Sequence, residues 1–135
     1  MRAFTAVTRI QEAALDGTQL DLSEYDVLVT LAGAPPEGMR PGDLAERVLL
    51  TKSGMTRLLQ RLEERGLVAR HACPLDRRGQ YIAMTPEGRH LLRRAAPALL
   101  RGLGTVLAPL STDDLGALRR AAERMTEATT AHSSE

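Results

Sequence analysis

Residues 51–64 carry side chains that are suited to contact with DNA. In their sequence, TKSGMTRLLQRLEE, four apolar residues recur at helical spacing, so the remaining positions form one polar helix face. Arginine can read guanine, glutamine can read adenine, and serine or threonine can reach bases or phosphates. We therefore interpret the segment as a DNA-contacting helix. Its candidate contact residues are Thr51, Lys52, Ser53, Thr56, Arg57, Gln60 and Arg61.

A solvated amphipathic helix would explain this pattern about equally well if the segment stood alone. Lys52, however, is the only lysine among 18 basic residues, and it lies in the first turn of the predicted helix. A cation there opposes the helix dipole, so an external anion explains its position better than helix stability does. The free N–H groups of a helix start also suit a phosphate.

The segment LDRRGQY, residues 75–81, predicts the tip of a β-hairpin. Two β-prone runs, VARHAC before it and YIAM at its end, flank the polar residues. Gly79 can adopt the positive φ that tight hairpin turns require. The tip is either a charged turn in solvent or a second contact with a polyanion. For the second reading the candidate residues are Asp76, Arg77, Arg78 and Gly79.

The charge distribution also favours a nucleic-acid surface in the middle of the chain. The 135 residues are enough for one domain, and the formal net charge is only +1. Residues 40–80, however, hold nine basic and five acidic groups, whereas residues 1–39 hold two basic and six acidic groups. Aromatic residues make up 2% of the chain, so the core must be aliphatic.

Several other classes of protein are disfavoured. No phosphate-loop motif is present and the three histidines form no catalytic set, so we expect no enzyme. His71 and Cys73 could supply half a metal site, but no further ligand lies nearby, and we expect no metal or cofactor. The single cysteine fits a reducing compartment, and no apolar run is long enough to span a membrane. We expect a cytoplasmic protein.

The pattern predicts six helices and one hairpin. Ala3 to Ala14 recur at helical spacing, and a capping residue or proline marks each later helix start. These starts are Ser23, in a capping box with Asp26, then Pro41, Thr51, Thr85 and Ser111. The fifth helix should reach about residue 107 with a bend at Pro97, and the sixth about residue 129.

The last two helices carry apolar seams. Apolar residues are spaced 4-3-4-3-4 from Leu92 to Leu110, and 3-4-3 from Leu115 to Met125. One small domain cannot bury both seams against itself. We therefore expect a homodimer that buries more than about 2,000 Å² of total surface.

The run LAERVLLTKSGMTRLLQRLEERGLV, the basic tip and then MTPEG at a long helix resemble the MarR family of bacterial transcription regulators. The resemblance covers nearly the whole chain, and LEERGLVAR with DRRGQYIAMTPEG is its most specific part. It implies a mainly α (α+β) fold, a winged helix-turn-helix with flanking dimerisation helices. The single MarR-type domain would span residues 1–135, with the DNA-binding part at about 20–86 and the dimerisation helices at about 1–17 and 87–130.

The resemblance also implies the roles of particular residues. Lys52, Ser53, Thr56, Arg57 and Gln60 would lie in the major groove of double-stranded DNA, and the tip of residues 76–78 would be the wing, with one arginine in the minor groove. The homodimer would bind a palindromic operator as a repressor that a small effector, often an anionic aromatic, releases. Tyr25 and Arg9 are the candidate effector contacts. The first helix is shorter than in the family. The alternative is a winged helix used only for protein contacts.

Overall fold

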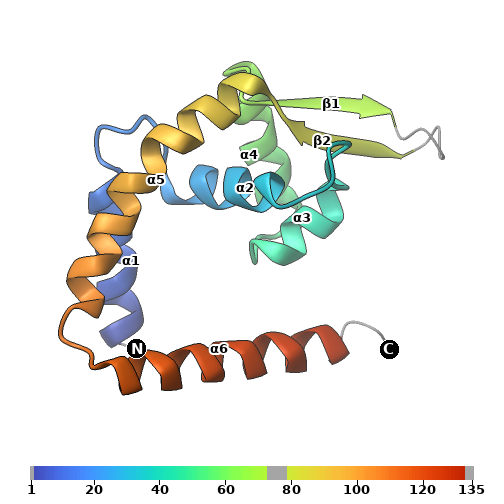
Figure 1. Ribbon diagram of the computed structural model, residues 1–135. Helices are drawn as coiled ribbons and strands as arrows, with labels where there is room; N and C mark the ends of the chain where they lie inside the picture. Colours follow the sequence, from blue (N-terminus) through green and yellow to red (C-terminus); the bar gives the residue numbers. More distant parts are fainter. Residues whose placement is uncertain (1, 73–78, 133–135) are drawn as a thin grey trace.

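The computed structural model describes residues 2–72 and 79–132 and shows a mainly helical winged helix-turn-helix (Figure 1). Helices α3 and α4 form the helix-turn-helix, and the two strands form the antiparallel hairpin that follows it. The elements are α1 (Arg2–Leu15), α2 (Leu22–Ala32), α3 (Pro41–Arg47), α4 (Lys52–Glu64), β1 (Val68–Ala72), β2 (Gln80–Met84), α5 (Pro86–Leu107) and α6 (Thr112–His132). The predicted fold class is confirmed.

Local capping sets most of the helix starts, as the sequence predicts. The Thr51 hydroxyl accepts the Gly54 N–H at 3.1 Å, and the Thr85 hydroxyl accepts the Gly88 N–H at 3.1 Å. The Ser111 hydroxyl accepts the Asp114 N–H at 3.2 Å, and Pro41 opens α3. Each of these contacts satisfies an N–H group that the helix itself leaves without a partner.

The start of α2 differs from the prediction. Its N-cap is Asp21, not Ser23: Asp21 Oδ1 accepts the Glu24 N–H at 2.8 Å, and Glu24 Oε2 accepts the Asp21 N–H at 3.1 Å. Glutamate is long enough to reach back from the third helical position, which makes the reciprocal capping box. The pair of Ser23 and Asp26 has the same spacing, but the helix begins two residues earlier.

The hairpin is joined to the helical body at its base. Its register runs from Val68 opposite Met84 to Ala72 opposite Gln80. Met39, in the connection before α3, pairs with Ile82 through backbone hydrogen bonds of 2.9 and 2.7 Å. A Cβ at position 38 would collide with the Ile82 carbonyl, so only glycine, here with φ +88°, permits this approach.

One aliphatic core fills the space between these elements. Its fully buried side chains come from α2, α3, α4 and β2, and they include Leu28, Leu44, Met55, Leu59, Leu62 and Ile82. The start of α5 closes the core with Leu91 and Leu92. The core therefore fixes α4 against α2 and leaves the opposite side of α4 in solvent.

The second half of α5 packs along α1, and α6 then runs apart from α2, α3 and α4 (Figure 1). A Cβ at Gly102 would lie 2.6 Å from the Ala14 side chain, so α1 and α5 approach closely there. Leu99 of the predicted seam is buried inside the chain, whereas Leu115 and Leu118 of α6 are 38% and 53% exposed. Within the chain, therefore, the α5 seam is largely used and the α6 seam is open.

Candidate nucleic-acid interface

The polar face of α4 lies on the surface, as the sequence predicts. Met55, Leu58, Leu59 and Leu62 are buried, which turns the opposite side of the helix outward. The candidate contact residues on that side are all exposed: Thr51, Lys52, Ser53, Thr56, Arg57, Gln60 and Arg61. A protruding helix with guanidinium, amide and hydroxyl groups on one side can enter a major groove.

Hydrogen bonds in the first turn constrain three of these hydroxyl groups. Thr51 caps the helix, and its hydroxyl also lies 3.3 Å from that of Ser53. The Thr56 hydroxyl donates to the Lys52 carbonyl at 2.9 Å. A hydroxyl that donates within the helix keeps lone pairs for an outside donor. Ser53 and Thr56 are thus oriented and remain accessible, and Thr51 sets where the helix begins.

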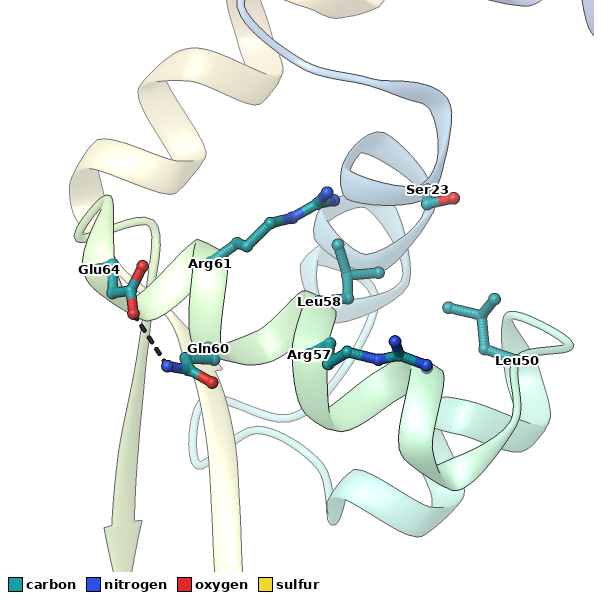
Figure 2. Close-up of a pocket in the computed structure, with 8 residues that line it drawn as sticks. Ser23, Leu50, Arg57, Leu58, Gln60, Arg61 and Glu64 are labelled. Atoms are coloured by element: carbon teal, nitrogen blue, oxygen red, sulfur yellow. Dashed lines mark hydrogen bonds between the residues drawn. The ribbon is translucent and has the colours of Figure 1, made fainter.

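An open groove of about 570 Å³ runs between α4 and the start of α2 (Figure 2). Arg57 extends along α4 toward Leu50, and Arg61 extends toward α2. The Gln60 amide donates to Glu64 Oε1 at 3.0 Å, so it is held by the next turn of its own helix. The lining residues are Ser23, Leu50, Gly54, Arg57, Leu58, Gln60, Arg61 and Glu64. The groove thus places Arg57 and Gln60 on the same exposed strip.

Arg61 has carboxylate partners inside the chain. Its Nη2 lies 3.0 Å from Asp21 Oδ2 and 3.7 Å from Glu24 Oε1. Sequence reasoning missed these contacts, and it also missed that Arg65 binds Glu24 at 2.8 Å. A weak signal was available in Glu24, one of two acids among the apolar residues of α2. The predicted contact of Arg61 with DNA stays a prediction.

The base of the wing is held by contacts to α3 and α4. Arg70 Nε donates to Glu63 Oε1 at 2.8 Å, which joins β1 to α4. The His71 ring stacks with the Tyr81 ring at 6.4 Å between centroids, and Arg40 lies over the same tyrosine at 6.0 Å. These contacts fix the orientation of the hairpin relative to α4 and to the start of α3.

The tip of the wing lies largely outside the described residues. Gly79 is half-buried directly before β2. Asp76, Arg77 and Arg78 fall in the segment that the structure does not describe, as does Cys73 of the suggested half metal site. Among the residues that are described, no cluster of histidine, cysteine and acidic side chains could hold a metal ion. The roles of Asp76, Arg77, Arg78 and Gly79 in DNA binding stay predictions.

The two candidate effector residues differ in how far they are exposed. Tyr25 is 8% exposed, in the core, whereas Arg9 is exposed on α1. Burial, and secondly the charge of Asp26, raise the pKa of Tyr25, so its phenol stays neutral. Neither residue lines the hollow of about 570 Å³ at the α1–α2 connection. That hollow has Glu12, Asp16 and Asp21 in its wall and no basic residue, which disfavours an anionic ligand.

Comparison with known proteins identifies the lineage of this chain. The profile of the MarR family matches residues 18–79. An uncharacterised HTH-type transcriptional regulator of Mycobacterium bovis, Mb0904, is 35% identical over 107 residues, which are 78% of this chain and 73% of the relative. The chain belongs to the MarR family. The MarR family relatives are transcription regulators and not enzymes.

Solved structures of MarR-type regulators share the whole fold. Sco3205, a MarR family transcriptional regulator from Streptomyces coelicolor solved in complex with DNA, is 29% identical, with a TM-score of 0.84 over 94% of this chain and 81% of its own. CouR from Rhodococcus jostii RHA1, bound to p-coumaroyl-CoA, is 32% identical, with a TM-score of 0.80 over 92% of this chain and 86% of its own. CouR, a transcriptional repressor, has also been solved on a 23-mer DNA duplex.

Within this MarR family chain, the flanking helices complete the architecture around the helix-turn-helix. In the described ranges, 2–72 and 79–132, no helix is long and apolar enough to cross a membrane. The exposed side of α4 is thus the surface whose side chains best fit a DNA groove.

Proposed function

We propose that the protein is a transcription regulator that binds double-stranded DNA at a specific palindromic site and acts as a repressor in the cytoplasm. The observation that carries this is the outward face of α4, where Lys52, Ser53, Thr56, Arg57 and Gln60 are all exposed on a helix fixed by its buried side. We propose no catalytic role, since the relatives are regulators.

Each exposed side chain of α4 receives a role from its chemistry. Arg57 and Gln60 would read base edges, because guanidinium and amide groups form bidentate contacts with guanine and adenine. Lys52 would bind a phosphate near the helix start, where the free N–H groups of the helix add to its attraction. In the wing, Arg77 and Arg78 would approach the minor groove, whose negative potential attracts arginine.

A homodimer would place two copies of α4 on one operator. The support is α6, whose Leu115 and Leu118 are exposed on a helix that projects from the rest of the chain. A two-fold dimer reads two half-sites related by the same symmetry, which is why the operator should be a palindrome. Each half-site would be bound by α4 and the wing of one protomer.

We propose that a small anionic aromatic effector releases the DNA. The relative CouR was solved with p-coumaroyl-CoA, which supports this class of ligand. Arg9 and Tyr25 remain the candidate contacts, with the cation on α1 and the ring on α2. Titration of the protein–DNA complex with a panel of aromatic carboxylates would test the proposal. Release should weaken in the Arg9→Ala variant, and release by none of the acids would refute it.

Selection from random duplexes tests the main proposal. The purified protein is mixed with a library of random double-stranded oligonucleotides, and the bound fraction is sequenced over several rounds. We expect enrichment of one palindrome whose half-sites lie about one helical turn apart, 34–36 Å. Bound DNA without any common sequence would contradict the proposal.

The alternative function is a winged helix that binds only proteins. Salt dependence separates the two, because each phosphate contact releases counterions and steepens the fall of affinity with salt. A weak dependence of partner binding on salt would favour the protein-only alternative, and a steep fall of DNA affinity with salt would favour DNA binding.

A further inference from the structure

Four charged residues join the N-cap and first turn of α2 to the last turn of α4 and its C-cap, Arg65. We call Asp21, Glu24, Arg61 and Arg65 the charge cluster. Arg65 Nη1 donates to Glu24 Oε2 at 2.8 Å, and Arg61 Nη2 lies 3.0 Å from Asp21 Oδ2 and 3.7 Å from Glu24 Oε1. Two arginines one helical turn apart therefore converge on one carboxylate.

Glu24 is the buried centre of the charge cluster. It is 6% exposed, and it is the one buried charged residue among the described side chains. The same oxygen that binds Arg65 also accepts the Asp21 N–H at 3.1 Å in the capping box of α2. The capping box fixes the carboxylate, and a buried charge must keep its partners because it has lost water. Arg65 is therefore held in place relative to α2.

Arg61 and Asp21 form a different kind of pair. Their side chains are 55% and 52% exposed, and exposed ion pairs contribute little because water and salt screen them. Arg61 can therefore leave Asp21 for a DNA phosphate at small cost, because Glu24 loses only its longer contact of 3.7 Å and keeps Arg65 at 2.8 Å. Arg65 remains on Glu24 during this exchange, so the orientation of α4 is maintained.

The position of Arg65 matters for base reading because of where it lies on the helix. Arg57 and Gln60 precede it by two turns and by about one turn of the same rigid helix. Arg65 also donates to the Gln19 carbonyl in the α1–α2 connection at 2.5 Å. A helix fixed at its C-terminal end has little freedom to rotate or tilt, and bidentate base contacts tolerate little of either.

We propose that Glu24 is a positioning residue for base recognition. Its buried carboxylate fixes the C-terminal end of α4 through Arg65, with Arg61 as an exchangeable neighbour, and so sets the rotation at which Arg57 and Gln60 meet the bases. Glu24 itself does not touch DNA. The inference rests on the proposed DNA-binding function and explains how the fold supplies its accuracy.

Two isosteric variants separate this role from helix capping. Glu24→Gln keeps the capping box, since glutamine serves equally at the third helical position, but it removes the charge that binds Arg65. Asp21→Asn keeps the N-cap, since asparagine caps as well as aspartate, but it removes the charge beside Arg61. Each variant removes one negative charge from the same region. Glu46→Gln makes the same change on α3, where Glu46 is exposed, and is the matched control.

The measurement is the affinity of each full-length variant for two duplexes of equal length, by fluorescence anisotropy in one buffer. One duplex carries the palindrome that the wild-type protein selects, and the other has a random sequence. We expect Glu24→Gln to lower the ratio of the two affinities by about tenfold, the size of one lost base contact. Asp21→Asn and Glu46→Gln should keep the ratio and bind both duplexes as tightly as the wild type or more tightly.

The direction of the change in the affinity ratio is decisive. By simple electrostatics, loss of a negative charge should strengthen binding to all DNA, so it does not explain a lower ratio. A Glu24→Gln protein that is folded by circular dichroism and keeps the wild-type ratio would overturn the proposal. So would an equal loss of ratio in Glu46→Gln. If the wild type selects no sequence at all, the proposed function itself fails, which is a distinguishable result.

A double variant covers the case in which Glu24→Gln does not fold. Glu24→Gln with Arg65→Gln removes both charges of the pair, so Arg65 is not left without its carboxylate partner. We expect this variant to fold on its unchanged core and to show the same loss of ratio, because it also lacks the ion pair between Glu24 and Arg65. A wild-type ratio in the folded double variant would overturn the proposal.

Discussion

Helices α4 and α6 are both amphipathic, yet they differ in what they expose. In α4 the apolar stripe is buried in the core, and the solvent side carries arginine, glutamine and hydroxyl groups. In α6 the leucines of the apolar stripe are themselves exposed, with Leu118 at 53%. Helix α4 buries its apolar stripe within one chain, whereas α6 does not.

The difference indicates two kinds of partner. A polar face in water costs little, so α4 can remain unbound until DNA is present. An apolar face in water costs about 25 cal/mol for each Å² that a partner could cover, so α6 favours permanent association. The helical wheel alone does not reveal this contrast, because it shows the same periodicity for both helices. The rest of the chain decides which face is left outside.

The largest effect is expected from charges placed on α6. The double variant Leu115→Asp and Leu118→Asp should produce monomers, because two buried carboxylates cannot be accommodated in an apolar interface. Loss of the second half-site contact should lower operator affinity by about 1,000-fold. Sedimentation velocity and anisotropy would measure the two effects. Arg120→Gln, on the same helix, is the control and should remain dimeric.

The wing provides the next test on the DNA side of the comparison. Arg77→Ala with Arg78→Ala should lower affinity on the order of 100-fold and reduce the salt slope by about one unit for each lost phosphate contact. The thermal midpoint should stay unchanged. Asp76→Ala should also weaken binding if the acid orients an arginine. Tighter binding by Asp76→Ala would show that Asp76 has no such role.

On α4 itself, the expected losses are smaller and depend on sequence. Arg57→Ala or Gln60→Ala should each cost about 1–3 kcal/mol on the selected operator and relax the preference at one base position. Binding to a random duplex should change much less. A loss of the same size on both duplexes would mean that these residues touch only phosphates.

The smallest effect concerns Leu49, in the turn before α4. It is 90% exposed and has φ +56°, a left-handed conformation that costs a leucine about 1–2 kcal/mol. After the greater chain entropy of glycine is subtracted, Leu49→Gly should stabilise the fold by about 0.5–1 kcal/mol. Urea unfolding would measure the gain. The dimer should be unaffected, which would distinguish this single exposed leucine from the pair on α6.

The prediction of helix starts from the sequence succeeded where one capping pattern was present. Thr51, Thr85 and Ser111 each cap the helix that they were expected to cap. Before α2, two patterns overlap, because Asp21 with Glu24 and Ser23 with Asp26 have the same spacing. Local propensity cannot separate two overlapping boxes. The contacts that Glu24 also makes with α4 come from residues about 40 positions away.

The exposed face of α4 in the candidate interface was predictable from the spacing of its apolar residues. A buried stripe at helical spacing determines the outward face, so the exposure of Arg57 and Gln60 follows from the sequence. The pairing of Arg61 and Arg65 with α2 depends on how two helices are oriented in space. The α5 seam shows the same limit, since its spacing fitted a coiled coil but Leu99 is buried within its own chain.

The bend of α5 has a consequence for the operator. This helix contains Pro97, and Figure 1 shows that it changes direction between the winged helix and the part that packs on α1. Proline removes one helical hydrogen bond and sets a kink. In the proposed dimer, the angle of this kink sets the distance between the two copies of α4. Inserting five base pairs between the half-sites would rotate one of them by about half a helical turn and move it out of reach of the second protomer.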